Sequence, residues 1–370
     1  MAEATSSAPK PARRINSRLR SNLITYGIVI VAFVVLQLLM LTGNLSNALA
    51  GQLVPITAYV CMAVSLNLVV GISGELSLGH AGFMSVGAFS GVTVASMLHA
   101  SGMNPIVGLL VSLVVGALIA GIVGFIVGIP VMRLHGDYLA IVTLAFGEII
   151  KNILNSLYVG FDKSGLHFSM TDSASLNMSG GTIVINGAQG ATGIAKVSTF
   201  AVGIILVLVT VTVVLNLMNS RSGRAIMAVR DNRIAAESVG INVTKYRLMA
   251  FVVAAALAGM AGAFYAQGFS SIVPKKFDFN LSILVLVFVV LGGMGNIRGS
   301  IISAALLTVL PELLRAINDW RMMIYAVLLI VVTIATNNPT ARQFFASIAS
   351  RFKRPVHEAA TEKGGEADGR

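Results

Sequence analysis

Four side chains that can carry a charge or exchange a proton lie in segments that are otherwise apolar. They are Glu75, His80, Asp137 and Glu148. If such segments cross a lipid bilayer, each charged group is costly there and is a functional candidate by default. For Glu148 the alternative is an interfacial group beside Lys151, three residues on and thus on the same helix face. For Glu75 and His80 the alternative is a solvated turn, and we expect Asp137 to cap the helix that follows it.

The sequence offers no metal, cofactor or hydrolase site. The five histidines are scattered, without an H-E-x-x-H motif or a paired carboxylate spacing. The P-loop pattern G-x-x-x-x-G-K-[ST] is missing, so ATP cannot be used by that route. Cys61 is the single cysteine, which excludes an intrachain disulfide. We therefore expect no catalytic residue, no metal and no cofactor in this chain.

The elements that position these residues are membrane helices. Hydrophobic residues make up 56% of the chain and charged residues 11%, with a mean hydropathy of +0.85. A bilayer core needs roughly 20 helical residues, and lipid leaves backbone amides without partners outside helices or closed barrels. We predict an all-α polytopic membrane protein with about ten transmembrane helices. They centre on 23–42, 50–70, 80–99, 106–130, 138–157, 199–217, 248–268, 281–297, 300–316 and 321–336.

The distribution of Lys and Arg sets the predicted orientation. With the N-terminus inside, the cytoplasmic segments hold 19 of the 26 Lys and Arg residues, which follows the positive-inside rule with both termini in the cytoplasm. This placement also accounts for the net charge of +11 without nucleic acid. The predicted domains are a basic cytoplasmic N-terminus (1–22), a transmembrane domain (23–337) and a cytoplasmic tail (338–370).

Glycine clusters interrupt two hydrophobic segments, near 71–82 and near 292–299. Interrupted segments in matching halves indicate non-helical backbone buried in protein or lining a cavity, as in transporters; short loops between spans are the alternative. Together with the turn-prone entry of a span at Gly136 and Asp137, they point to transport. Our candidates for a translocation path are Gly74, Glu75, His80, Asp137, Tyr138 and Glu148. Stripes of small residues at 116–128 and 254–266 predict close helix packing.

Two long connections complete the organisation. The outer one, 158–198, is either a folded cap or a mobile loop. The cytoplasmic one, 218–247, contains a short helix that Asn232 can cap and Gly240 can end in the left-handed region. Because Ile234, Ala235 and Val239 cannot be buried within this loop alone, we predict docking to another protein; a helix lying on the membrane or on its own bundle is the alternative.

Four ordered blocks resemble the M-type permease subunit of branched-chain amino acid ABC importers, over roughly 55–337. They are Gly-Ile-Ser-Gly-Glu-Leu-Ser-Leu-Gly-His-Ala-Gly-Phe (71–83), Leu-His-Gly-Asp-Tyr-Leu-Ala-Ile-Val-Thr-Leu-Ala-Phe-Gly-Glu-Ile-Ile (134–150), Arg-Asp-Asn-Arg-Ile-Ala-Ala-Glu-Ser-Val-Gly-Ile-Asn (230–242), and Val-Leu-Gly-Gly-Met-Gly (290–295) with Leu310-Pro311-Glu312-Leu313. The resemblance implies a non-enzymatic, multi-pass subunit of the bacterial inner membrane. It also implies four kinds of neighbour, namely membrane lipid, an H-type permease, two cytoplasmic ATPases and an external substrate-binding protein. In such importers the loop carrying Ala235, Ala236, Glu237 and Gly240 would couple to the ATPase.

Two features depart from the family pattern, and two other functions stay open. The outer-loop glycine block stands at 186–194 after extra residues, and the last span ends in Asn337-Asn338-Pro339 in place of an Arg-Pro-x-Gly-Leu ending. Urea or short-chain amide permeases of the same superfamily share the blocks. An ion-coupled secondary transporter would use Glu75 or Glu148 as its coupling carboxylate, whereas an intramembrane enzyme lacks a Ser/His or Asp pair at plausible depth.

Overall fold

The computed structural model describes residues 17–42, 46–134, 136–162, 164–178 and 180–314, with single positions between 320 and 330. The chain divides into two units, Met1–Leu313 and Leu314–Arg370, and the elements below belong to the first. The predicted span 321–336 lies largely outside the described residues. The tail 338–370 lies wholly outside them, as do residues 1–16 of the basic N-terminus.

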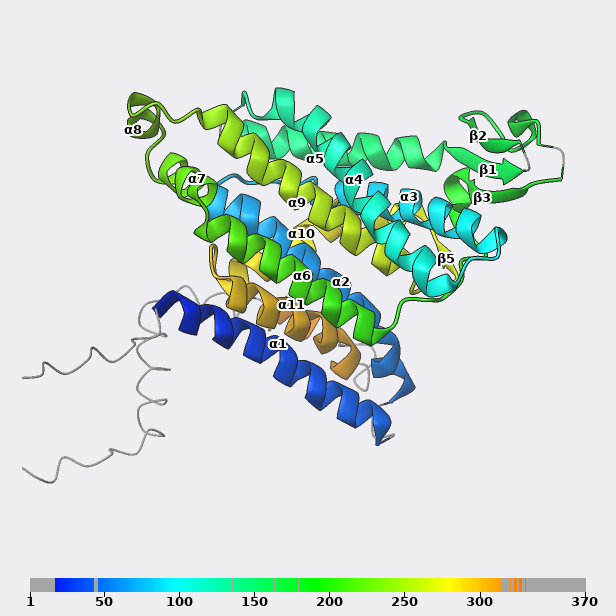
Figure 1. Ribbon diagram of the computed structural model, residues 1–370, viewed down its shortest axis with the longest axis horizontal. Helices are drawn as coiled ribbons and strands as arrows, with labels where there is room; N and C mark the ends of the chain where they lie inside the picture. The colour runs from blue at the N-terminus through cyan, green and yellow to red at the C-terminus, as the bar shows by residue number, and fades with distance from the viewer. Residues whose placement is uncertain are drawn as a thin grey trace, which may run out of the picture. The chain divides into compact units, whose positions relative to one another are not determined.

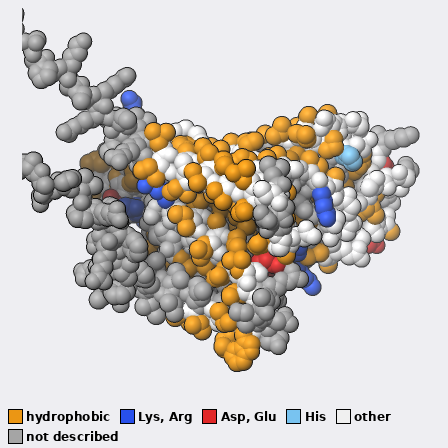
Figure 2. All heavy atoms as spheres, turned by 90° about the horizontal axis from the view of Figure 1, so that it is seen from below, with side chains coloured by type: hydrophobic (Ala, Val, Ile, Leu, Met, Phe, Trp, Pro, Cys, Tyr) orange, Lys and Arg blue, Asp and Glu red, His pale blue; other side chains and the backbone are white. Residues whose placement is uncertain are grey.

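Long apolar helices dominate the described part of the chain (Figure 1), which confirms a polytopic helical membrane protein. Six are long and apolar enough to cross a membrane: α1 (Ser17–Leu41), α2 (Asn47–Asn67) with its continuation to Ser73, α3 (His80–Ala100), α4 (Pro105–Val131), α6 (Phe200–Asn219) and α9 (Val243–Ala266). Three further predicted spans also form helices: α5 (Asp137–Asn155), α10 (Phe279–Gly292) and α11 (Ile297–Leu313). On the face shown in Figure 2, hydrophobic side chains cover much of the helical surface.

Helix α9 is the centre of the bundle, because α2, α3 and α4 all pack against it. Small residues permit this. A β-carbon added at Gly259 would lie 2.2 Å from the β-carbon of Ala120 on α4, and one added at Gly262 would lie 1.9 Å from the carbonyl oxygen of Met84 on α3. Without a hydrophobic force between helices in lipid, such backbone approach is a main source of association. The predicted role of the small-residue stripes in close packing is confirmed.

The connection 158–198 and residues 271–272 after α9 form a small antiparallel sheet in the strand order β2-β1-β3-β4-β5. Its strands are β1 (Tyr158–Asp162), β2 (Gly165–Ser169), β3 (Thr182–Asn186), β4 (Ala191–Thr192) and β5 (Ser271–Ile272). The basic connection instead holds two helices, α7 (Arg221–Asp231) and α8 (Arg233–Ser238). Because α9 starts just after α8 and leads into β5, the sheet and α8 lie at opposite ends of this helix (Figure 1). Its 24 residues span about 36 Å, longer than a bilayer core of about 30 Å.

The two glycine-rich interruptions differ in character. After α2 the chain forms a π-helix, Leu68–Ser73, which ends at Gly74 with φ of 77°. Residues 74–79 are then non-helical, and Glu75, Ser77 and Gly79 are buried there, so a solvated turn is the wrong interpretation. The second interruption is a half-exposed turn between α10 and α11.

The two interruptions also touch each other. The Gly295 amide donates to Asn67 Oδ1 at 2.8 Å, and a β-carbon on Gly71 would lie 2.1 Å from the Gly295 nitrogen. Asn67 Nδ2 in turn donates to Ser300 Oγ on α11 at 3.0 Å. The buried end of α2 is therefore joined to the turn and to the helix after it.

The close α4–α9 contact makes Gly259 sensitive to any larger side chain. We expect Gly259→Leu to lower the free energy of unfolding by about 3 kcal/mol, because the added atoms must push two backbones apart. Gly27→Leu is the control, since a β-carbon there meets nothing within 4 Å. Thermal unfolding in detergent checks this, and equal midpoints for the two variants would contradict it.

Candidate functional site

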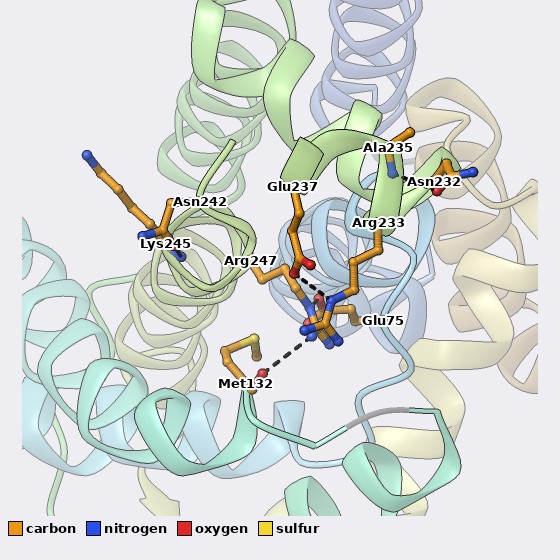
Figure 3. Close-up of polar contacts among 9 residues, drawn as sticks. All are labelled: Glu75, Met132, Asn232, Arg233, Ala235, Glu237, Asn242, Lys245 and Arg247. Carbon is orange, nitrogen blue, oxygen red and sulfur yellow. Dashed lines mark hydrogen bonds and ion pairs between the residues drawn. The ribbon is translucent and has the colours of Figure 1, made fainter. Parts of the chain in front are cut away.

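A buried ion pair joins three elements at the α8 end of the bundle (Figure 3). Arg247, in the second turn of α9, donates from Nε to the Glu75 carboxylate in the non-helical segment. Its Nη1 also donates to the carbonyl oxygen of Met132, just after α4, at 3.3 Å. Glu75 is 7% exposed and Arg247 8% exposed. A carboxylate in such surroundings needs the guanidinium, because removing either charge from water alone is very costly.

Glu75 lies in a stretch in which buried and exposed residues alternate. From 73 to 77 burial alternates along the chain: Ser73, Glu75 and Ser77 are buried, while Gly74 and Leu76 are exposed. Within the described residues, the two serine hydroxyls and Glu75 Oε2 have no hydrogen-bond partner from the protein. Buried polar atoms of this kind are rare in proteins, and a functional role is one of the explanations for them.

A second arginine contacts the same segment from α7. Arg230 Nη1 donates to the Gly71 carbonyl oxygen at 3.0 Å, while its Nε and Nη2 hold Asp231 Oδ1. Its aliphatic part lies against Gly74, where an added β-carbon would stand 2.6 Å from Arg230 Cγ. The basic loop thus contacts residues 71–75 twice, once before α8 and once after it. We call these two contacts, Arg230 with Gly71 and Arg247 with Glu75, the arginine clamp.

Helix α8 has the predicted residues at its two ends, and it packs against α7 and α9. Asn232 Oδ1 accepts from the Ala235 amide at 3.0 Å, and Gly240 has a φ of 83°. Ala236 is buried against Val229 of α7 and Val243 of α9. Of the four residues predicted to couple to another protein, Ala236 therefore packs on the protein's own helices, while Ala235, Glu237 and Gly240 are exposed.

The outer face of α8 presents apolar side chains to the surroundings. Ile234 is 80% exposed and Val239, which follows the helix, is 74% exposed. Arg233 Nε and Glu237 Oε1 are 3.0 Å apart across one turn, with both side chains partly exposed. The helix and the residue after it therefore present two apolar side chains and one ion pair to the surroundings.

His80 lies inside the bundle at the start of α3. Its Nε2 is 2.8 Å from Ser65 Oγ on α2, and the ring is 2% exposed. The next residue's amide donates to Ser282 Oγ on α10 at 3.1 Å. The solvated-turn alternative is therefore wrong for His80 as well.

The remaining candidates belong to α5 and do not join the buried pair. Asp137 is the first residue of α5, and Gly136, with φ of 58°, stands at the cap position without a side-chain cap bond, so the predicted capping by Asp137 is wrong. Tyr138 is 73% exposed. Glu148 pairs with Lys151 on the same helix, as the alternative for this residue stated. The link from α5 to the interrupted segment is Thr143, whose Oγ1 accepts from the Leu78 amide at 3.1 Å.

Sequence reasoning missed Arg230 and Arg247. The sequence places both among the basic residues of the predicted cytoplasmic loop, and Arg230 also begins the block 230–242, but neither is predicted to contact residues 71–75. A signal existed for Arg247, because it lies inside a helix that continues as an apolar span, where a cation requires a partner. No such signal marks Arg230. Among the described residues, no group of three or more His, Cys, Asp or Glu side chains could hold a metal ion.

The buried pair should matter more to stability than the pair on α5. We expect Arg247→Met to lower the free energy of unfolding by about 3–5 kcal/mol, because Glu75 is left buried without its partner. Lys151→Met is the matched control and should cost about 1 kcal/mol or less, since the Lys151–Glu148 pair is partly exposed. Denaturant unfolding in mixed micelles measures both, and similar losses would contradict the ranking.

Several known permease proteins are similar to this chain in sequence. The high-affinity branched-chain amino acid transport system permease protein LivM of Salmonella typhimurium is 35% identical over 288 residues, and that of Escherichia coli K12 is 36% identical over 293 residues. The probable branched-chain amino acid transport permease protein LivH of Methanocaldococcus jannaschii is 28% identical over 172 residues, 46% of each chain. The LivM matches cover 75% of this chain and 66% of each relative.

No solved structure matches the chain significantly. Residues 48–333 match the family described as branched-chain amino acid transport system / permease component. This range contains the interrupted segment, both arginines of the clamp, α8 and the sheet. The chain belongs to this family of permease components.

Proposed function

We propose that the protein is a permease subunit of an ATP-driven importer for branched-chain amino acids in the bacterial inner membrane. The observation that carries the proposal is α8, a capped helix with Ile234 and Val239 exposed and with its flanking arginines bound to the interrupted segment. Such a helix suits docking of an ATPase that drives movement in the bundle. The substrate class follows the names of the two LivM relatives.

The partners follow from the same reasoning. The chain is similar to LivM proteins over 75% of its length and to LivH proteins over a smaller share. Two related permease chains would form the translocation path between them, with one ATPase on each and a binding protein on the outer side. In this assembly the catalytic work belongs to the ATPases, and this chain supplies half of the path.

The proposed topology has ten transmembrane helices and both termini in the cytoplasm. It rests on the 19 of 26 Lys and Arg residues in the predicted cytoplasmic segments. Placement of α8 and the sheet at opposite ends of α9 supports it. Cys61 is buried, so a cysteine introduced at the exposed Ser173 can be labelled selectively; its labelling from the cytoplasmic side alone would contradict the topology.

The ion-coupled alternative has less support. A coupling carboxylate must be free to exchange its ion, whereas Glu75 is paired with Arg247 and Glu148 with Lys151. Both candidates thus already have a cation within hydrogen-bonding reach. We therefore favour coupling through α8 over coupling through a carboxylate.

Transport driven by ATP tests the proposed function. Vesicles containing this chain, an H-type permease, the ATPases and the binding protein should take up leucine only with ATP, and uptake should continue when an uncoupler is added. Excess isoleucine or valine should compete, whereas urea should not. Leucine uptake by this chain alone under a pH gradient would contradict the proposal.

The exposed apolar residues of α8 predict where the ATPase binds. Fully burying a side chain of this size contributes about 1.5–3 kcal/mol, so Ile234→Ser or Val239→Ser should each weaken ATPase binding by about tenfold or more. Folding should be unchanged, because both side chains are exposed. Met170→Ser is the control, since Met170 is 61% exposed and follows β2 at the other end of the bundle. Pull-down titration measures the affinity, and unchanged binding in both α8 variants would contradict this assignment.

A further inference from the structure

The arginine clamp flanks α8 on both sides. Arg230 ends α7 and reaches the Gly71 carbonyl, and Arg247 in α9 reaches the Glu75 carboxylate. These two attachment points lie four residues apart at the end of the π-helix. The loop therefore contacts the segment at residue 71 and at residue 75. A displacement of the loop would act directly on the backbone between these two residues.

The loop can act as one body. Ala236 of α8 is buried between Val229 of α7 and Val243 of α9, with Ile241 packed against them. Asn232 bonds to α8 through the Ala235 amide, and Asn242 caps α9 through the Lys245 amide at 3.0 Å. A push on the outer face of α8 is thus passed to the helix end that carries Arg230 and the helix start that carries Arg247.

The segment that the clamp holds has features of a movable element. Residues Leu68–Ser73 form a π-helix, a rare geometry that is frequent at functional sites. Shifting its hydrogen bonds to the α-helical register would rotate Ser73 and Glu75 about the helix axis. The polar atoms of Ser73, Ser77 and Glu75 Oε2 that lack a protein partner are those that such a rotation would move.

Movement of this segment would reach the rest of the bundle. Gly71 lies against Gly295, and Asn67 bonds both to Gly295 and to Ser300 of α11. On the other side, Leu78 is bonded to Thr143 of α5. Residues 67–78, which include this segment and its two neighbours Asn67 and Leu78, therefore have direct contacts with α5, with the α10–α11 turn and with α11.

Resting on the proposed function, we propose that Arg230 and Arg247 are positioning residues that transmit the movement of α8 to the interrupted segment 71–77. Docking and nucleotide-driven displacement of the ATPase would shift α7, α8 and the start of α9 together. The clamp would then move the segment and, through Gly295 and Thr143, the helices beside the path. The role of each guanidinium is mechanical, and neither contacts the amino acid.

The test uses the complete importer in vesicles with Arg230→Met, which keeps an aliphatic chain beside Gly74 but cannot donate to the Gly71 carbonyl. We expect normal ATPase association and continued ATP hydrolysis, with leucine uptake lowered about tenfold, so that more ATP is hydrolysed per leucine transported. Arg230→Lys retains a donor and should recover part of the uptake. Arg224→Met is the control on the same helix, because Arg224 donates to the Asn219 carbonyl at 3.3 Å and should transport normally.

The outcomes separate the inference from the function on which it rests. Normal uptake by Arg230→Met would overturn the inference while leaving ATP-driven import intact. Association, hydrolysis and uptake falling in equal proportion would also overturn it, since that pattern indicates only less folded importer. If Arg230→Met fails to fold, the number of ATP molecules hydrolysed per leucine transported is measured for Arg247→Lys instead. An unchanged number in that variant would also overturn the inference. Failure of wild-type vesicles to use ATP would instead refute the proposed function.

Discussion

The architecture depends on one electrostatic constraint: a carboxylate buried at the end of an interrupted helix must have a cation beside it. Arg247 meets that requirement for Glu75 and at the same time contacts the carbonyl oxygen of Met132. One side chain thereby fixes the interrupted segment, the end of α4 and the start of α9. Because α9 begins only a few residues after α8, the same side chain also links the exposed helix to the bundle interior.

Close packing of the helix backbones fixes the positions of the two charged side chains relative to each other. Lipid gives no hydrophobic force between helices, so small residues that permit contact decide which helices associate. Gly259 and Gly262 place α9 against α4 and α3 respectively, and a similar approach between Gly71 and Gly295 brings the two interruptions together. The segment between these packed helices has a π-helix, buried non-helical backbone and polar atoms without protein partners.

Much of this was predictable from sequence, and the rest required long-range contacts. Hydropathy located the helices because lipid demands long apolar segments, and local chemistry located α8, since Asn232 and Gly240 act on neighbouring residues. Pairing over long distances in the chain was not predictable. The partner of Glu75 is 172 residues away, and a single sequence does not say which of several basic residues meets it. The cap assigned to Asp137 failed because Gly136 takes that position. The sequence of residues 158–198 is compatible with a folded cap or a mobile loop. The pairing of β1 with β3, which decides between them, is a contact between separate parts of the connection.

A double-mutant cycle on Glu75 and Arg247 tests the central claim most directly. The free energy of unfolding would be measured for Glu75→Gln, Arg247→Met and the double variant in mixed micelles. If the two side chains depend on each other, the double variant should lose little more than either single variant, with a coupling free energy of about 2–3 kcal/mol. Losses that add to within about 0.5 kcal/mol would show that the two residues act independently, and the ion pair could then not be the contact that holds the interrupted segment to α9.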